Sequence, residues 1–248
     1  MLTIQSNVSL KSYNTFGIDV TTRYLVEVDN DQDIQTLFQL PDIQSLPKLI
    51  LGGGSNLLLT QDFNGLVIKI NIKGIETVKE DQDHVWLRVG AGENWHEFVM
   101  WCIDQDFGGV ENMSLIPGNI GSAPIQNIGA YGVELKDTFE GCEALLMDTL
   151  EIKEFKNSDC HFGYRESIFK QELKDKCVIV SVTLKLTTQN HQLHTAYGSI
   201  NEELLKNGIE QPTIKQVSDA VIAIRKSKLP DPKELGNSGS FFKNPEIP

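Results

Sequence analysis

The stretch from residue 116 to residue 132, IPGNIGSAPIQNIGAYG, constrains the fold of this chain more than any other segment. It holds four glycines and two prolines and carries no charged residue. Glycine has no Cβ and accepts positive φ, while proline stiffens the path, so such a segment brings main-chain N–H groups close to a neighbour. An ordinary surface loop is the alternative, but it would normally contain more Asp, Lys or Glu. The composition therefore favours a loop that faces a ligand with its backbone.

The overall composition is that of an ordinary globular protein. The 248 residues are 40% hydrophobic and 23% charged, which is enough for the core of one large domain or two smaller ones. There are 34 acidic and 22 basic side chains, and the resulting net charge of −12 disfavours nucleic acid and anionic membranes as partners. No apolar run approaches the roughly 20 residues of a membrane helix, and the N-terminus lacks the pattern of a secretory signal. We expect a cytoplasmic protein.

Cysteine and histidine are spaced in ways that argue against a metal centre. The chain has no C-x-x-C pair and no H-E-x-x-H motif. His191 and His194 are three residues apart but flank a polar segment, so surface positions are favoured over metal ligation. We interpret the cysteines as reduced packing residues. They are Cys102, Cys142, Cys160 and Cys177, and the other histidines are His84, His96 and His161.

Short β-branched runs alternate with a few amphipathic segments. The runs predict strands, because they are bounded by Gly, Asn or Asp, and the spacing of apolar residues by three and four predicts helices. Strands are expected at residues 24–28, 48–51, 66–70, 85–89, 143–147 and 178–186, and helices at 31–40, 95–106 and 213–226. This order indicates an α+β or mixed α/β chain.

A second glycine-rich segment, GGGSN at residues 52–56, follows the apolar strand expected at 48–51. It is not a P-loop, because no Gly-Lys-Ser/Thr follows, and Leu57 stands where the third glycine of G-x-G-x-x-G would be. A tight structural turn and a phosphate cradle explain this segment equally well when it is taken alone. The presence of residues 116–132 favours the cradle.

A basic cluster stands out against the acidic background. Arg225, Lys226 and Lys228 end the last expected helix, and Lys243 lies in the glycine-rich tail. They could attract an anionic ligand, although a solvated helix end is the simpler alternative because cations favour the last turn of a helix.

Six motifs in order resemble the UDP-N-acetylenolpyruvoylglucosamine reductase family of flavoenzymes, of the longer-loop type. They are NTFG at 14–17, LGGGSN at 51–56, GAGENW at 90–95, the loop at 116–132, GYRES at 163–167 and GNSGSFFKNP at 236–245. The resemblance implies an α+β fold with a two-part FAD-binding region of the vanillyl-alcohol oxidase type, plus the start of a truncated substrate-binding domain. We expect FAD-binding subdomains at residues 1–72 and 73–190 and the partial substrate-binding domain at 191–248.

The resemblance also implies the chemistry. NADPH would reduce non-covalently bound FAD, and the reduced flavin would pass hydride to C3 of a UDP-N-acetylglucosamine enolpyruvate, giving UDP-N-acetylmuramate for peptidoglycan. Full-length members continue beyond the position of Pro248 and contribute a catalytic glutamate, so we expect this chain to bind FAD but to turn over poorly. Its oligomeric state is left open. A flavin oxidase of the same fold and a non-enzymatic nucleotide-binding module are the alternatives.

The resemblance assigns roles to individual residues. Arg165 would stabilise the enolate and Ser240 would protonate it. A structural ion pair of Arg165 with Glu166, and a turn-forming role of Ser240, are the alternatives. Cofactor-binding residues would be Gly52, Gly53, Gly54, Ser55, Asn56, Pro117, Gly118, Gly121, Ser122, Gln126, Asn127, Gly129 and Arg225. Substrate-binding residues would be Tyr131, Tyr164, Tyr197, Lys228 and Asn244, and Tyr197 is equally plausible as an ordinary loop tyrosine.

Overall fold

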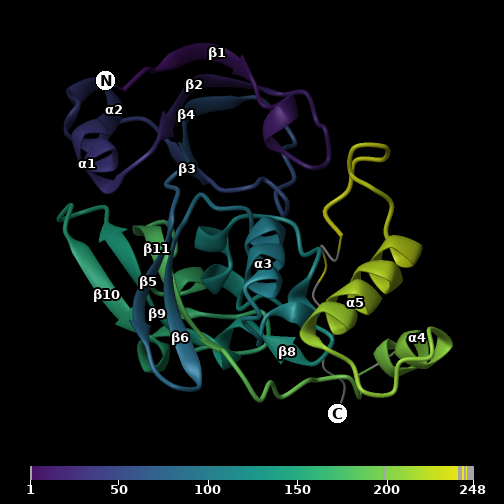
Figure 1. The fold of residues 1–248 in the computed structure, drawn as a ribbon. Coiled ribbons are helices and arrows are strands. Elements are labelled where there is room, and N and C mark those ends of the chain that lie inside the picture. The colour runs from purple at the N-terminus through teal and green to yellow at the C-terminus, as the bar shows by residue number, and fades with distance from the viewer. Residues whose placement is uncertain (1, 198, 240–241, 243, 245–248) are drawn as a thin grey trace.

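The computed structural model describes residues 2–197, 199–239, 242 and 244. Two β-sheets lie next to each other, and a pair of C-terminal helices packs at one side (Figure 1). No helix within the described ranges is long and apolar enough to cross a membrane. Short 3-10 helices occupy Lys11–Tyr13, Glu111–Met113, Ile120–Ser122, Pro124–Gln126, Leu135–Asp137, Asn157–Cys160 and Ile168–Lys170.

The first sheet has four strands in the order β1-β2-β4-β3. These are β1 (Gln5–Ser9), β2 (Thr21–Val28), β4 (Phe63–Ile70) and β3 (Lys48–Leu51). Strands β2 and β3 both pair in parallel with β4, whereas β1 pairs antiparallel with β2. Helices α1 (Asp31–Gln39) and α2 (Pro41–Gln44) connect β2 to β3. Both faces of the sheet are buried, as its β-branched strands require.

The second sheet has five antiparallel strands in the order β10-β9-β11-β6-β5. They are β10 (Ile152–Lys156), β9 (Phe139–Leu146), β11 (Cys177–Thr187), β6 (His84–Gly90) and β5 (Ile75–Glu80). Helix α3 (Trp95–Asp104) contributes Trp95 and Phe98 to the core that covers this sheet. A short hairpin of β7 (Gly129–Ala130) and β8 (Val133–Glu134) follows the glycine-rich loop.

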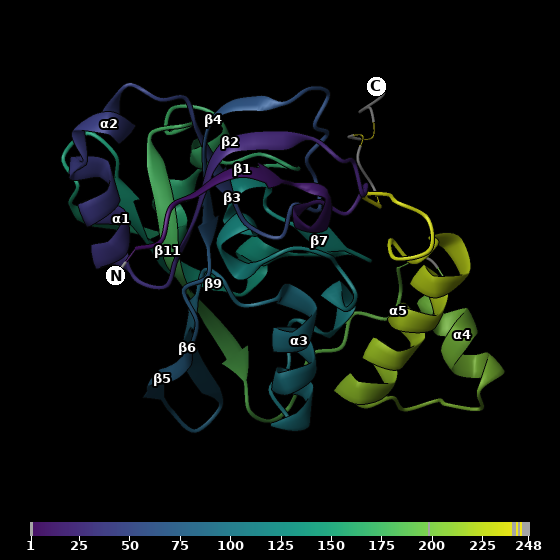
Figure 2. The same cartoon turned by 90° about the horizontal axis from the view of Figure 1, so that it is seen from above.

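Helices α4 (Ile200–Lys206) and α5 (Ile214–Lys228) form the third part of the chain and lie on the side opposite α1 and α2 (Figures 1 and 2). Thr213 begins α5 with a capping box, because its hydroxyl accepts from the N–H of Gln216. Ser218 of α5 hydrogen-bonds Ser114 at 2.7 Å between the two hydroxyl oxygens. This buried contact fixes α5 beside the segment that leads into the glycine-rich loop.

All six expected strands and all three expected helices are confirmed, and the fold is of the expected α+β class. The expected strand 143–147 begins earlier, at Phe139. The expected helix 31–40 ends at Gln39, because Leu40 precedes Pro41 and is extended. The expected helix 95–106 ends at Asp104.

Candidate cofactor and substrate site

The two glycine-rich segments meet face to face. A Cβ at Gly53 would lie 2.8 Å from the Cα of Gly118, and a Cβ at Gly118 would lie 2.9 Å from the Oγ of Ser55. Gly54 has a φ of +62°, and a Cβ there would collide with the carbonyl oxygen of Tyr13. Only glycine allows this approach and this φ. The two segments therefore pack closely against each other at Gly53 and Gly118.

The NTFG motif holds the turn at residues 52–56 through a main-chain hydrogen bond. The side-chain amide of Asn14 donates to the carbonyls of Leu10 (2.7 Å) and Ile18 (3.0 Å), and the N–H of Thr15 donates to the carbonyl of Gly54 at 3.1 Å. On the opposite side the ammonium of Lys69 donates to the carbonyl of Gly52, and burial lowers the pKa of Lys69. These contacts use carbonyls of the turn. Within the described residues, the main-chain N–H groups of residues 53–56 donate to no protein acceptor.

The GAGENW motif anchors the second loop. The N–H of Gly121 donates to the carbonyl of Ala91, and the N–H of Ile120 donates to that of Glu93, both at 2.9 Å. A Cβ at Gly121 would lie 2.6 Å from that of Ala91. Gly121 is therefore required for packing between the loop and this motif, and its N–H group, which we expected to face a ligand, is used inside the protein.

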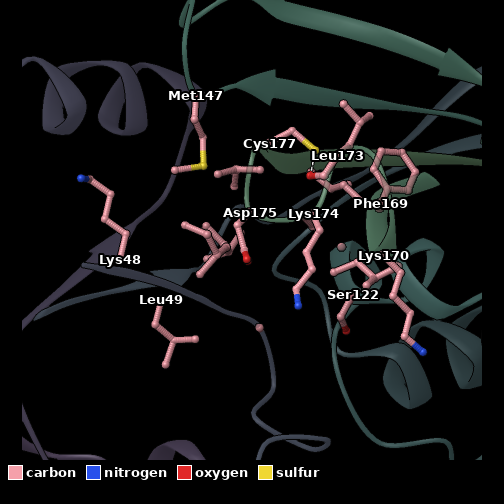
Figure 3. A pocket seen from close by; sticks show the side chains of 18 residues that line it. Lys48, Leu49, Ser122, Met147, Phe169, Lys170, Leu173, Lys174, Asp175 and Cys177 are labelled. Atoms are coloured by element: carbon pink, nitrogen blue, oxygen red, sulfur yellow. Dashed lines mark hydrogen bonds between the residues drawn. The ribbon is translucent and has the colours of Figure 1, made fainter. Parts of the chain in front are cut away.

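Two adjoining cavities run along the junction of the sheets. Each has a volume of about 300 Å³, and five residues are shared between them: Leu49, Ile50, Gly52, Ser122 and Ile125. In the first cavity, Lys48 and Leu49 of β3 lie across from residues 169–177, which contribute Phe169, Lys174 and Cys177 (Figure 3). The second cavity continues past the glycine-rich turn toward α5. Together the cavities form one elongated groove, which we call the junction groove.

Most of the expected cofactor-binding residues line the second cavity. They are Gly52, Gly53, Gly54, Ser55, Asn56, Pro117, Ser122, Gln126, Gly129 and Arg225, and the expected catalytic residue Arg165 joins them. Gly118 lies behind this wall in contact with Ser55. The sequence motifs that lie far apart along the chain are thus brought to one surface.

Comparison with known proteins shows the family of this chain. A family model described as FAD binding domain matches residues 22–153. The UDP-N-acetylenolpyruvoylglucosamine reductase of Flavobacterium johnsoniae is 60% identical over 98% of this chain and 71% of its own length. The chain belongs to the UDP-N-acetylenolpyruvoylglucosamine reductase family. The enzyme of that name from Amoebophilus asiaticus is 51% identical, again over 98% of this chain and 72% of its own length.

Solved structures show the same fold. The crystal structure of UDP-N-acetylenolpyruvylglucosamine reductase from Thermus caldophilus has a TM-score of 0.70 at 24% identity and covers 99% of this chain and 76% of that chain. A solvent-stable cholesterol oxidase has a TM-score of 0.56 at 11% identity, over 75% of this chain and 38% of that one. With the family match, these likenesses confirm the expected FAD-binding α+β region of a reductase-family flavoenzyme.

The residues of the junction groove fit a flavin dinucleotide. The glycine-rich turn and the unused N–H groups of residues 53–56 suit a diphosphate. Two buried polar atoms on the second cavity, Nε of Arg225 and Oγ of Ser238, have no hydrogen-bond partner within the described residues. Buried polar atoms in native proteins nearly always have a hydrogen-bond partner. The two unpartnered atoms therefore indicate a bound group with acceptor oxygens.

Arg165 is held from the protein side of the groove. It has a φ of +55°, its guanidinium lies 5.2 Å from the ring centroid of Tyr164, and Nη1 donates to the carbonyl of Asn127 at 3.1 Å. Its carboxylate neighbour is Glu134, 3.8 Å from Nη1. The ion pair that we considered from the sequence, with Glu166, is replaced by this one.

Asn127 is placed differently from the other expected cofactor ligands. It is fully buried with a φ of +42°, and its side chain hydrogen-bonds Glu134, the carbonyl of Gly163 and the N–H of Lys136. The amide is therefore fully used within the protein. The structure gives this side chain a supporting position behind Arg165.

Of the expected substrate-binding residues, Tyr131, Tyr197 and Lys228 lie on the α4–α5 side, and Tyr164 lies beside Arg165. The rings of Tyr131 and Tyr197 meet edge to face, with centroids 6.4 Å apart, and Tyr197 is 60% exposed. Burial raises the pKa of Tyr131, against the opposing charge of Arg225. Lys228 ends α5 and is exposed, as is Asn244. Ser240 lies outside the described residues.

Sequence reasoning missed Ser238 and Glu134. Ser238 stands two residues before Ser240 in the GNSGS motif, and the N–H of neighbouring Asn237 donates to the carbonyl of Thr15 at 3.0 Å. The motif itself was the only available signal for Ser238.

Within the described residues, no group of three or more His, Cys, Asp or Glu side chains is arranged to hold a metal ion.

Proposed function

We propose that this chain is an FAD-dependent, NADPH-linked reductase of UDP-N-acetylglucosamine enolpyruvate, which yields UDP-N-acetylmuramate for peptidoglycan synthesis. The observation that carries the proposal is the junction groove: a glycine-rich cradle with unused N–H donors leads to Arg165, in a chain 60% identical to a relative of that name. When bound in this groove, FAD would supply the hydride chemistry that links NADPH to C3 of the enolpyruvyl group.

The cradle positions the cofactor. The N–H groups of residues 53–56 would donate to its diphosphate, and the closed contact between Gly53 and Gly118 would keep side chains and water from that site. The unpartnered Arg225 Nε and Ser238 Oγ would bind oxygens of the bound molecules at the other end of the second cavity. Gly121 and Asn127 would contribute by supporting these loops.

Non-covalent attachment is supported by the groove lining. No histidine is found among its described residues, and the cysteine there is Cys177. Burial raises the pKa of the Cys177 thiol to about 11, and its sulfur lies 3.8 Å from the carbonyl oxygen of Leu173. A protonated thiol is a poor nucleophile, so it would not attach to a flavin ring.

Arg165 would stabilise negative charge on the substrate, and Ser240 would donate a proton to it. The guanidinium is permanently cationic and would stabilise the negative charge that develops beside the substrate carboxylate when C3 accepts hydride. Ser240 would then donate a proton to C2. Tyr131, Tyr164, Tyr197, Lys228 and Asn244 would bind the UDP-sugar. We assign residues 1–72 and 73–190 to the FAD-binding subdomains and 191–248 to the substrate-binding region; β4 ends at Ile70, and β11 at Thr187.

The flavin spectrum tests this function. The purified protein should show flavin absorbance that denaturation releases into solution, NADPH should bleach it under anaerobic conditions, and the enolpyruvyl sugar nucleotide should then restore it. Substrate-dependent peroxide formation would identify an oxidase instead. Failure of NADPH to bleach the bound flavin would contradict the reductase assignment and favour a binding module.

A further inference from the structure

One short segment, residues 127–134, surrounds the guanidinium of Arg165. Nη1 donates to the carbonyl of Asn127 at 3.1 Å, and Nη2 donates to the carbonyl of Gly129. Oε1 of Glu134 lies 3.8 Å from Nη1. Arg165 still lines the second cavity, so these contacts hold it from behind while it faces the groove.

Glu134 is the charged centre of this arrangement. Its Oε2 accepts from the side-chain amide of Asn127 at 3.1 Å and lies 2.8 Å from the ammonium of Lys136. The hydrogen bond and charge of Glu134 raise the pKa of Lys136. Arg165 and Lys136 thus share the carboxylate of Glu134, and the charge of nearby Asp137 also raises the pKa of Lys136.

The β7–β8 hairpin packs the side chain of Glu134 against Gly129. Glu134 of β8 pairs with Gly129 of β7, and a Cβ on Gly129 would lie 2.9 Å from the Cγ of Glu134 and 2.6 Å from the carbonyl oxygen of Val133. The side chain of Glu134 therefore lies directly over Gly129, whose own carbonyl accepts from Arg165. The main-chain N–H of Glu134 donates to Asp137 at 2.8 Å, which fixes its backbone.

Asn127 links Glu134 to the backbone segment that contains Arg165. Its amide donates to the carbonyl of Gly163 at 3.0 Å, two residues before Arg165, and its Oδ1 accepts from the N–H of Lys136 at 3.0 Å. The left-handed φ of +55° at Arg165 is unfavourable for an arginine and needs such support. Both the backbone and the head group of Arg165 thus depend on the same pair, Asn127 and Glu134.

We propose that Glu134 is a positioning residue for Arg165: its carboxylate, bridging the Asn127 amide and the guanidinium, holds the cation at the place where the substrate carboxylate binds. This role rests on the proposed function of Arg165. A free arginine side chain loses rotamer entropy when a ligand orders it, and the bridge removes that cost before the ligand arrives. Glu134 itself does not line either cavity of the groove.

A binding experiment with FAD-loaded protein separates positioning from general stability. Two ligands are compared by calorimetry: UDP-N-acetylglucosamine enolpyruvate, and UDP-N-acetylglucosamine, which lacks the carboxylate. Glu134→Ala should weaken the first about tenfold or more and change the second less than about twofold. Glu134→Gln, whose amide oxygen still accepts from Asn127, should recover part of the loss. Glu140→Ala, at an exposed position of β9 outside the groove lining, is the matched control and should leave both affinities near wild type. Equal weakening of both ligands by Glu134→Ala would overturn the proposal.

A second measurement needs no substrate. The chain has four arginines, so the guanidinium ¹⁵N signals can be assigned with Arg165→Lys. In wild-type protein Arg165 should show slow rotation and separate Nη signals, and these should merge in Glu134→Ala. Unchanged Arg165 signals would refute the positioning role. If the signals merge as expected but wild-type protein binds both ligands equally, the proposed role of Arg165 in carboxylate recognition fails while the positioning by Glu134 stands.

Discussion

At the residue scale, the cradle depends on the absence of single side chains. Gly53 and Gly52 are neighbours in the same turn, yet their surroundings differ. A Cβ at position 53 would lie 2.8 Å from the backbone of Gly118, whereas a Cβ at position 52 would find only ordinary contacts, the nearest at 3.7 Å. Backbone cannot rotate away as a flexible side chain can, so the two positions should respond differently to the same methyl group.

Gly53→Ala is therefore expected to separate the two loops. We expect it to lower the free energy of unfolding by about 1–3 kcal/mol and to weaken FAD binding, because the N–H donors move apart. Gly52→Ala should cost less than about 0.5 kcal/mol. Urea unfolding of the FAD-free proteins and a fluorescence titration with FAD measure the two effects. Equal stability of the two variants would contradict this account.

At the element scale, strands with an apolar pattern were predictable and polar edge strands were not. β5, with the sequence IETVKE, and β10, with IKEFK, lie at the two edges of the second sheet and are largely exposed. Charged residues protect such edges from aggregation, and they also remove the alternation that identifies a strand in sequence. The helix α4 was missed for a similar reason, since only Ile200 and Leu204 are buried.

The candidate site shows the same division. The glycine-rich segments could be found from composition alone, because Gly53 and Gly54 are required by local geometry. Glu134 could not be found, because its partners Asn127 and Arg165 reach it only through tertiary contacts. Ser240 belongs to the GNSGSFFKNP motif of the tail, and it lies outside the described residues.

His96 of helix α3 forms a hydrogen bond to the residue that precedes the glycine-rich loop. Its Nδ1 accepts from the N–H of Leu115 at 3.0 Å, and Leu115 has a φ of +60°. Burial lowers the pKa of His96 below its ordinary value near 6.5, as do the charges of Lys226 and Arg225, while Glu97 opposes the shift. A protonated Nδ1 could no longer accept this hydrogen bond.

The stability of the protein should therefore fall on mild acidification. The unfolded chain takes up a proton at His96 as the pH drops below about 6.5, but the folded chain resists it, so the free energy of unfolding decreases from that pH toward the lower folded pKa. His96→Asn keeps an acceptor near the Nδ1 position and cannot titrate, so its stability should depend less on pH between about 7 and 5. His161→Asn, at an exposed site, is the control. Identical pH profiles for wild type and His96→Asn would contradict the prediction.

At the scale of the whole molecule, one hydrophobic cluster joins the two sheets. Val26, Ile68 and Leu66 of the first sheet pack in the same cluster as Leu145 and Val178 of the second. Val178 also lines the junction groove, whereas Val182, four residues along β11, belongs to the core under α3. Both valines are almost fully buried, at 1% and 0% exposure.

This arrangement predicts a separation of stability from cofactor affinity. Val178→Ala and Val182→Ala should each reduce the free energy of unfolding by about 1.5–3 kcal/mol. Only Val178→Ala should also raise the Kd for FAD, because it loosens the junction between the sheets. Chemical unfolding and an FAD titration give the two quantities. A comparable rise in Kd for Val182→Ala would show that the groove is insensitive to which core is disturbed.

Residues of both sheets line the junction groove, so a molecule bound there contacts both sheets and stabilises their packing. Unfolding must release that molecule, and mass action then couples the durability of the fold to the supply of cofactor. Once free FAD exceeds its Kd, every further tenfold rise adds about 1.4 kcal/mol to the free energy of unfolding. A cell short of riboflavin would thus hold a more fragile population of this protein, cleared faster by its proteases.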